Sequence, residues 1–231
     1  AANPNTVVLL NAGGNVDMSK WIDKVPSLLH LWYAGQEGGT AVAEILFGKV
    51  NPSGKLPISF EKKWEDNPAY PYYYDVDGDK RVEYKEGLFM GYRHYDVSET
   101  KPQFAFGYGM SYTTFKYSDL RIDREKGRDL VVKIRFTVKN TGKHDGAETA
   151  QVYIRPINPK VERPYKELKG FAKHFIRKNT VQEIEITLDK DAFSYYKTEL
   201  KDFDYDVGSY EVLVGSASDD IRLRKVIQIE K

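Results

Sequence analysis

Cysteine is absent from the 231 residues of this sequence, which excludes disulfide bonds and zinc–thiolate sites. An excess of one charge is also missing, because 35 lysine and arginine residues face 34 aspartate and glutamate residues, and the formal net charge is +1. Electrostatics therefore gives no reason to expect nucleic acid or a membrane surface as a partner, and a neutral ligand fits better. The four histidines are scattered without ligand spacing, so we expect neither a metal site nor a cofactor.

Long apolar runs are missing as well. Runs such as residues 7–10 are far too short to cross a bilayer, and no cleavable signal is visible at the first residues. The chain opens almost directly on a buried-looking strand, so we expect that it begins inside a domain and that any export signal lies upstream.

The residues that are present indicate a globular chain with room for two domains, since 41% are apolar and 30% are charged. Aromatic residues make up 13% and include 17 tyrosines. Exposed aromatic faces suit the apolar faces of sugar rings, but packing within β-structure explains the same content more simply.

Residues 1–62 alternate strand and helix signals. We expect strands at 6–10, 27–33 and 55–60, the first two buried, and helices at 18–25 and 40–47. Asp17 is expected to cap the first helix, and Gly48 to end the second in the left-handed conformation. Three strands and two helices leave sheet edges uncovered and a core incomplete, so this region is predicted to be part of an α/β sandwich whose partner half lies elsewhere.

Residues 63–111 show little periodicity outside 88–95 and are rich in tyrosine, proline and glycine. Long loops are usually functional or disordered, and the aromatic content argues against disorder. We interpret this region as an ordered connecting arm.

From residue 112 to 231 the hydrophobic period becomes two. Val132, Ile134, Phe136 and Val138, for example, alternate with polar residues, and turn signals separate the alternating runs. About seven short strands in this length predict an antiparallel β-sandwich of the immunoglobulin or fibronectin type III kind.

Four segments, taken in order, resemble the C-terminal half of glycoside hydrolase family 3. They are Val-Val-Leu-Leu-Asn-Ala-Gly at 7–13, Trp-Tyr-Ala-Gly-Gln-Glu-Gly-Gly at 32–39, Asn-Pro-Ser-Gly-Lys-Leu-Pro at 51–57, and Phe-Ala-Phe-Gly-Tyr-Gly-Met-Ser-Tyr-Thr-Thr-Phe at 104–115. The resemblance covers essentially the whole chain. It implies the end of the family's α/β-sandwich domain followed by its fibronectin type III-like domain, in a β-glucosidase-like protein.

The resemblance also implies a retaining mechanism, in which two carboxylates about 5–5.5 Å apart act as nucleophile and as acid/base. In the family, the nucleophilic aspartate belongs to a preceding barrel domain and the acid/base glutamate lies upstream of the segment that resembles residues 11–14. No catalytic residue is therefore expected here, and the chain alone is expected to be inactive.

Asn11 and Glu37 are the candidates for substrate contact. Asn11 follows the end of a buried strand, where open α/β sheets place ligand sites, although a domain interface without ligand explains the loop equally well. Glu37 stands beside two glycines at a helix start, and the simpler interpretation is that Gln36 and Glu37 satisfy the first helical amides.

The function implied by the resemblance is hydrolysis of terminal non-reducing β-D-glucosyl residues, together with the barrel portion of the enzyme, expected as a separate chain. The alternatives are a β-xylosidase of the same family, a structural module that supports a homodimer, or a carbohydrate-binding module. A periplasmic or secreted location is the corresponding expectation.

Overall fold

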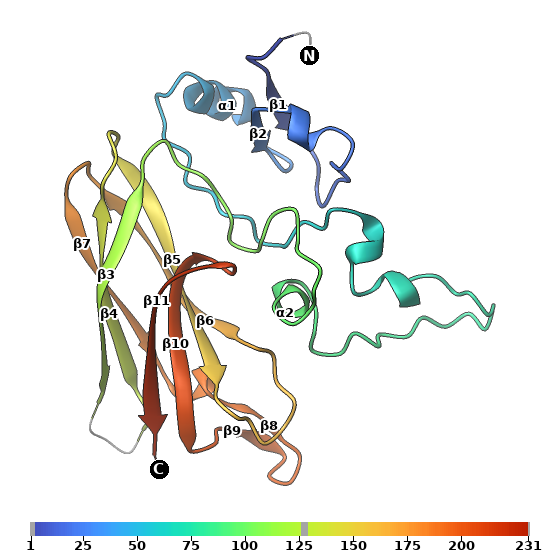
Figure 1. The fold of residues 1–231 in the computed structure, drawn as a ribbon, viewed down its shortest axis with the longest axis vertical. Helices are drawn as coiled ribbons and strands as arrows, with labels where there is room; N and C mark the ends of the chain where they lie inside the picture. The colour runs from blue at the N-terminus through green and yellow to red at the C-terminus, as the bar shows by residue number, and fades with distance from the viewer. Residues whose placement is uncertain (1–2, 126–128, 231) are drawn as a thin grey trace. The chain divides into compact units, whose positions relative to one another are not determined.

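A computed structural model describes residues 3–125 and 129–230 (Figure 1). The chain forms two compact units. The N-terminal unit comprises Ala1–Val50 and Ile58–Ala105, and the sandwich unit comprises Asn51–Pro57 and Phe106–Lys231. The chain therefore crosses from one unit to the other three times. The domain boundaries expected after residues 62 and 111 remain predictions, but residues 51–57 group with the sandwich. No described helix has the length and apolar character needed to cross a bilayer.

The N-terminal unit contains a parallel pair of strands, β1 (Val7–Leu10) and β2 (Ser27–His30), in register from Val7 opposite Ser27 to Leu10 opposite His30. The expectation that both strands are buried is wrong for this chain, because Val7 and Leu9 are 45% and 43% exposed. No third strand pairs with them among the described residues, which leaves both edges open. The second strand ends before residue 33, since Trp32 adopts a φ of 54°.

Helix α1 (Gly38–Leu46) confirms the second predicted helix, and Gly48 follows it at φ 73° and donates its amide to the Ile45 carbonyl. The helix predicted over residues 18–25 is wrong. Only a 3-10 turn, η1 (Ile22–Lys24), forms there, because the chain is already extended at Val25, before Pro26. Asp17 instead caps a turn, accepting hydrogen bonds from the amide and hydroxyl of Ser19.

The third predicted strand, residues 55–60, is also wrong. Pro57 lacks an amide donor, and the residues beside it form short extended contacts only. Within the sandwich unit, Leu56 exchanges hydrogen bonds with Gly107 and Tyr108, and within the N-terminal unit Phe60 forms an isolated antiparallel bridge to Phe104.

The remainder of the N-terminal unit is ordered around aromatic side chains. It contains two 3-10 turns, η2 (Trp64–Asp66) and η3 (Tyr70–Tyr72), and a short helix, α2 (Tyr92–Tyr95). The Trp64 ring packs edge-on against Tyr70 and Tyr73, with centroids 5.7 and 5.1 Å away. The periodicity at 88–95 yields only one helical turn because Gly91 adopts φ 53°.

The sandwich unit confirms the predicted antiparallel architecture. Its three-stranded sheet has the order β3 (Phe115–Arg124), β4 (Val132–Asn140), β7 (Val181–Leu188). Its four-stranded sheet has the order β11 (Asp220–Ile229), β10 (Gly208–Ala217), β5 (Gly146–Pro156), β6 (Glu167–Ile176). A short 3-10 turn, η4 (Lys190–Ala192), precedes a separate hairpin of β8 (Tyr195–Lys197) and β9 (Asp202–Asp204). Figure 1 shows the long strands running side by side.

The core of the sandwich lies between these sheets. The predicted inward residues of β4, Val132 to Val138, are at most 1% exposed, and Phe136 stacks on Tyr117 from β3. Gly170 in β6 leaves room for the Ile186 side chain, since a Cβ there would lie 2.7 Å from Ile186 Cγ2. Burial of these apolar side chains is the main source of stability.

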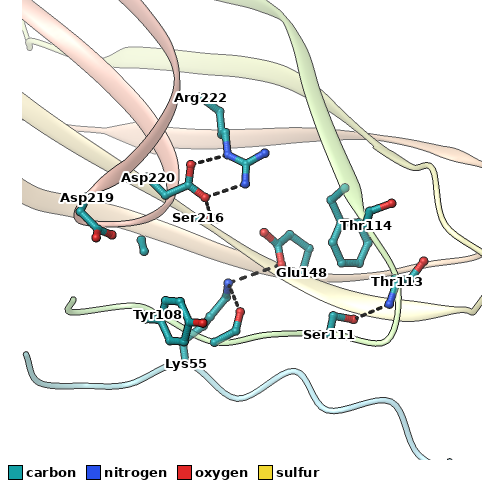
Figure 2. Close-up of a pocket in the computed structure, with 13 residues that line it drawn as sticks. Lys55, Tyr108, Ser111, Thr113, Thr114, Glu148, Ser216, Asp219, Asp220 and Arg222 are labelled. Carbon is teal, nitrogen blue, oxygen red and sulfur yellow. Dashed lines mark hydrogen bonds and ion pairs between the residues drawn. The ribbon is translucent and has the colours of Figure 1, made fainter. Parts of the chain in front are cut away.

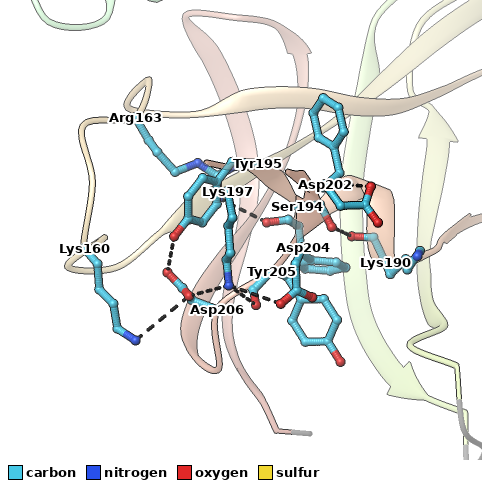
Figure 3. A network of polar contacts seen from close by, with 12 residues as sticks. Lys160, Arg163, Lys190, Ser194, Tyr195, Lys197, Asp202, Asp204, Tyr205 and Asp206 are labelled. Carbon is cyan, nitrogen blue, oxygen red and sulfur yellow. Dashed lines mark hydrogen bonds and ion pairs between the residues drawn. The ribbon is translucent and has the colours of Figure 1, made fainter. Parts of the chain in front are cut away.

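The hairpin at the end of the sandwich is held by Lys197 (Figure 3). Its ammonium donates to Asp204, to the Tyr205 carbonyl and to Asp206 at 3.2, 3.0 and 2.9 Å. Tyr195 donates its hydroxyl to Asp206 at 3.0 Å. Burial opposes ionisation of Asp206, but these hydrogen bonds outweigh it and the pKa of that carboxyl lies below its usual range.

Candidate functional site

Two loops meet at the carboxyl ends of β1 and β2. The strands are parallel and in register, and the Leu31 amide continues the ladder by donating to the Leu10 carbonyl at 2.8 Å. The loop after β1 passes directly beneath Tyr33, because a Cβ on Gly13 would lie 2.6 Å from the tyrosine ring. Loops at this end of a parallel sheet are the usual location of ligand sites.

Asn11 lies on the first of these loops, with an exposed side chain immediately after β1. Glu37 is the N-cap residue of α1, and its backbone carbonyl accepts the first helical hydrogen bond, from Ala41. Its carboxylate accepts from the Thr40 hydroxyl at 3.0 Å and does not cap a helical amide, which differs from the simpler interpretation of this residue. No described contact joins Asn11 to Glu37, and their part in substrate binding stays a prediction.

The second loop carries a strained tryptophan. Trp32 has positive φ, a conformation unusual for a bulky residue and one that occurs in turns and at functional sites. Its amide donates to Nδ1 of His30, and its ring lies 4.2 Å from the His30 ring and 6.4 Å from Phe60. Since Nδ1 is an acceptor, a neutral His30 carries its proton on Nε2, which is buried without a described partner.

The loop after β1 is also held by hydrogen bonds of Asn15, at its C-terminal end. The Asn15 side-chain amide donates to the Ser59 carbonyl at 3.1 Å and contacts the Glu61 carboxylate. Glu61 in turn accepts from Asn67 at 3.2 Å. These bonds hold residues 11–15 against a distant part of the chain, so the loop is positioned by more than its own turn.

A polar pocket in the sandwich unit was not predicted from the sequence (Figure 2). Lys55 Nζ lies 3.7 Å from Oε2 of Glu148 and donates to the Gly109 carbonyl at 3.3 Å. Tyr117 donates its hydroxyl to Oε1 of Glu148 at 2.8 Å. Burial and the neighbouring Glu148 charge raise the pKa of Tyr117 far above its usual value, so the phenol remains a donor.

The sequence of β5 contains a pattern that could have indicated the buried carboxylate of the pocket. Gly146, Glu148, Ala150, Val152 and Ile154 share the inward phase of this strand, and all five are buried. A glutamate in phase with core residues needs a buried donor, because burying a carboxylate without hydrogen bonds is costly. The signal gives no indication that the donor is Tyr117 or that Lys55 forms the ion pair.

One exposed acidic cluster lies in the N-terminal unit. Ligand oxygens of Asp75, Asp77 and Asp79 lie within 4.8 Å of one another. The oxygens of Asp75 accept from the Gly78 and Lys80 amides at 2.8 and 2.9 Å, so this carboxylate shapes the turn. Such exposed clusters commonly hold no ion.

Comparisons with known proteins bear on the whole chain. Residues 1–112 match the family model described as glycosyl hydrolase family 3 C-terminal domain, and residues 148–218 match the fibronectin type III-like domain. The chain is 45% identical over 226 residues to thermostable beta-glucosidase B of Acetivibrio thermocellus, covering 97% of this chain and 30% of the relative. It is 42% identical to a beta-glucosidase of Kluyveromyces marxianus, covering 100% of this chain and 27% of that protein.

Solved structures agree with these matches. The crystal structure of the Kluyveromyces marxianus beta-glucosidase in complex with glucose superposes with a TM-score of 0.92 at 42% identity, covering 100% of this chain and 27% of that one. Beta-glucosidase 3B from Thermotoga neapolitana in complex with glucose gives a TM-score of 0.89 at 35% identity, covering 97% and 31%. The chain thus spans about 30% of the length of the relatives it matches. With both family domains matched in order, this chain belongs to glycoside hydrolase family 3 and carries the family's C-terminal domain sequence followed by its fibronectin type III-like domain.

Proposed function

We propose that this chain is the C-terminal part of a retaining β-glucosidase that hydrolyses terminal non-reducing β-D-glucosyl residues. One observation carries the proposal: nearly the whole chain matches proteins named beta-glucosidase, at 45% identity in the first case. On this proposal the nucleophile and the acid/base belong to the barrel portion and to the upstream part of the α/β-sandwich domain. The chain is inactive without them.

Exposed apolar side chains support the need for a partner portion. Phe47 and Tyr33 in the N-terminal unit are 89% and 80% exposed, and the β1–β2 pair exposes both Val7 and Leu9. Large apolar side chains that are this exposed favour an interaction site. The proposed partner is the barrel portion of the same enzyme, present as a separate chain.

The loops after β1 and β2 are the proposed contribution to the substrate cleft. Asn11 is exposed at the carboxyl end of β1. His30, with its buried Nε2, is the last residue of β2, and Trp32, with its positive φ, follows in the adjacent loop. We assign these residues a positioning role, because the retaining chemistry needs two carboxylates that the proposal places upstream. Glu37 remains the second candidate for substrate contact.

Hydrolysis assays test the proposal directly. The chain alone, and the chain mixed with the upstream portion of its own enzyme, are assayed with p-nitrophenyl β-D-glucoside and β-D-xyloside. We expect activity only in the mixture, with the glucoside preferred. Activity of the chain alone would refute the missing-carboxylate argument, and an inactive mixture that nonetheless forms a stoichiometric complex would refute the glycosidase assignment. Preference for the xyloside would favour the β-xylosidase alternative.

A further inference from the structure

The pocket at one end of the sandwich unit has the volume of a small-molecule site. Its volume is about 510 Å³, within the roughly 300–1,000 Å³ range of ligand pockets. Its residues come from four separate segments, 55, 108–115, 148 and 216–222, all of which belong to the sandwich unit. Figure 2 shows the polar side chains from these segments converging on one space.

A buried carboxylate with spare acceptor capacity forms part of the pocket wall. The Glu148 side chain is 7% exposed, and among the described residues the one donor that hydrogen-bonds to it is Tyr117, through Oε1. Oε2 lies 3.7 Å from Lys55 Nζ, beyond the roughly 2.7–2.9 Å of a charge-assisted hydrogen bond. Oε2 therefore remains able to accept a hydrogen bond from a ligand.

Donors lie close to this acceptor. Lys55 uses one hydrogen bond on the Gly109 carbonyl, and an ammonium offers three. Arg222 binds Asp220 through Nε and Nη2 at 2.5 and 2.6 Å, and its guanidinium has further donors at Nη1. The Tyr108 ring adds an aromatic wall.

The charge balance selects the class of ligand. Three carboxylates, Glu148, Asp219 and Asp220, face two cations, Lys55 and Arg222, so the lining does not favour an anion. Lys55 already stands beside Glu148, where a bound cation would be placed. Interspersed donors and acceptors next to an aromatic face match a molecule with several hydroxyl groups and an apolar ring face.

We propose that this pocket binds a neutral polyhydroxylated ligand, namely a monosaccharide or the terminal unit of an oligosaccharide. The Oε2 atom of Glu148 accepts from one ligand hydroxyl, and the Lys55 ammonium donates to another. The site goes beyond the proposed function, because its lining includes no residue of the β1 and β2 loops and it requires no catalytic carboxylate. Only the choice of glucose as the first probe rests on that function.

Amide NMR spectra of the full 231-residue chain during titration with glucose and cellobiose test the proposal. We expect saturable shifts confined to residue 55 and to residues 108–115, 148 and 216–222. Glu148→Gln should weaken binding about tenfold, because it replaces a charged acceptor by a neutral one. Glu185→Gln is the matched control, since it removes the same charge from a residue on the other sheet, and its affinity should equal that of the unaltered chain.

Asp219→Asn provides a second variant at an exposed position on the pocket rim, where folding is not at risk. Asp219→Asn should weaken sugar binding at least severalfold, and the amide signals of residues outside the pocket should not change. Absence of saturable shifts with both sugars overturns the proposal, as does equal affinity in Glu148→Gln and Glu185→Gln. Saturation by sulfate in place of sugar, or equal affinity for glycerol and glucose, overturns it as well. Because no hydrolysis is measured, these results are independent of the β-glucosidase assignment.

Discussion

Lys55 and Glu148 form a nearly buried ion pair, with Nζ and Oε2 3.7 Å apart and side chains 14% and 7% exposed. Lys55 belongs to the Asn-Pro-Ser-Gly-Lys-Leu-Pro segment, and Glu148 belongs to β5 of the sandwich. The pair thus joins a segment near the start of the chain to the sandwich core. Removing one member of a buried pair leaves the other charge without compensation.

Lys55→Met should therefore destabilise the sandwich unit by about 2 kcal/mol. The double variant Lys55→Met/Glu148→Gln should recover part of this loss, because the uncompensated charge is gone. Urea unfolding followed by far-UV circular dichroism measures both effects. Lys49→Met is the control, since Lys49 is 73% exposed in its pair with Glu44 and should change stability by less than about 0.5 kcal/mol. Equal effects of the two lysine variants would contradict the structural role of Lys55.

The Asn51 side chain hydrogen-bonds residues 51–57 to two turns of the sandwich. Its Nδ2 donates to the Asp145 carbonyl at 2.9 Å, and its Oδ1 accepts from the Ser111 hydroxyl and the Tyr112 amide at 2.9 and 2.8 Å. Asn51→Ala should cost about 1–3 kcal/mol of sandwich stability, because three partners lose their hydrogen bonds. Hydrogen exchange of β5 and β10 amides measures the loss, and the exposed Asn5→Ala serves as control. Unchanged exchange in Asn51→Ala would show that the segment is not part of the sandwich fold.

Gly109 and Gly54 differ in the space that each leaves for a side chain, so alanine substitutions at the two positions can be compared. A Cβ on Gly109 would lie 2.2 Å from the Gly54 carbonyl oxygen, whereas a Cβ on Gly54 meets no atom within 4 Å. Gly109→Ala should destabilise the sandwich by several kcal/mol, since a backbone atom has to move. Gly54→Ala should be neutral or slightly stabilising. Thermal unfolding of the two variants tests this difference, and similar midpoints would refute the close approach.

The buried Tyr95 predicts a loss of stability at alkaline pH. Burial raises the pKa of its hydroxyl from 10.0 to about 12. In the unfolded chain the phenol ionises near pH 10, so the unfolded state binds fewer protons there and stability falls as the pH rises from 10 towards 12. The difference corresponds to at most about 3 kcal/mol.

Tyr95→Phe should remove this part of the pH dependence, and it should lower stability at neutral pH slightly, because the hydroxyl no longer donates to the Asp66 carbonyl. The fluorescence of Trp21, Trp32 and Trp64 is a suitable probe, because all three tryptophans belong to the N-terminal unit, as does Tyr95. Identical unfolding profiles of the two proteins between pH 10 and 12 would contradict the burial effect.

Local patterns predicted the local structure well. The alternation from Val132 to Val138 predicted β4 because one face of the strand is buried in the same chain, and Gly48 marked the end of α1 because its conformation depends on neighbouring residues only. The helix expected at 18–25 failed where apolar spacing competed with the turn at Asp17 and the extended backbone at Val25.

Contacts between segments far apart in the sequence could not be predicted from local patterns. The strand predicted at 55–60 has the composition of a strand, but Leu56 pairs with Gly107 and Tyr108 outside any sheet. Neither the partner of Glu148 nor the ring of Tyr33 over Gly13 follows from spacing, since each depends on how the chain returns to itself. For the candidate site, Asn11 and Glu37 were located at a strand end and a helix start, but the hydrogen bond from Thr40 to the Glu37 carboxylate was not predicted.

The chain changes from one unit to the other three times, and this determines which fragments stay associated after a protease cuts it. A single cleavage between residues 58 and 105 severs the polypeptide, yet residues 51–57 stay bonded through Asn51 and Lys55 to the sandwich portion of the other fragment. The nicked molecule should migrate as one particle under native conditions and as two bands after denaturation. Complementation between separately produced halves should accordingly succeed when the cut falls between residues 58 and 105.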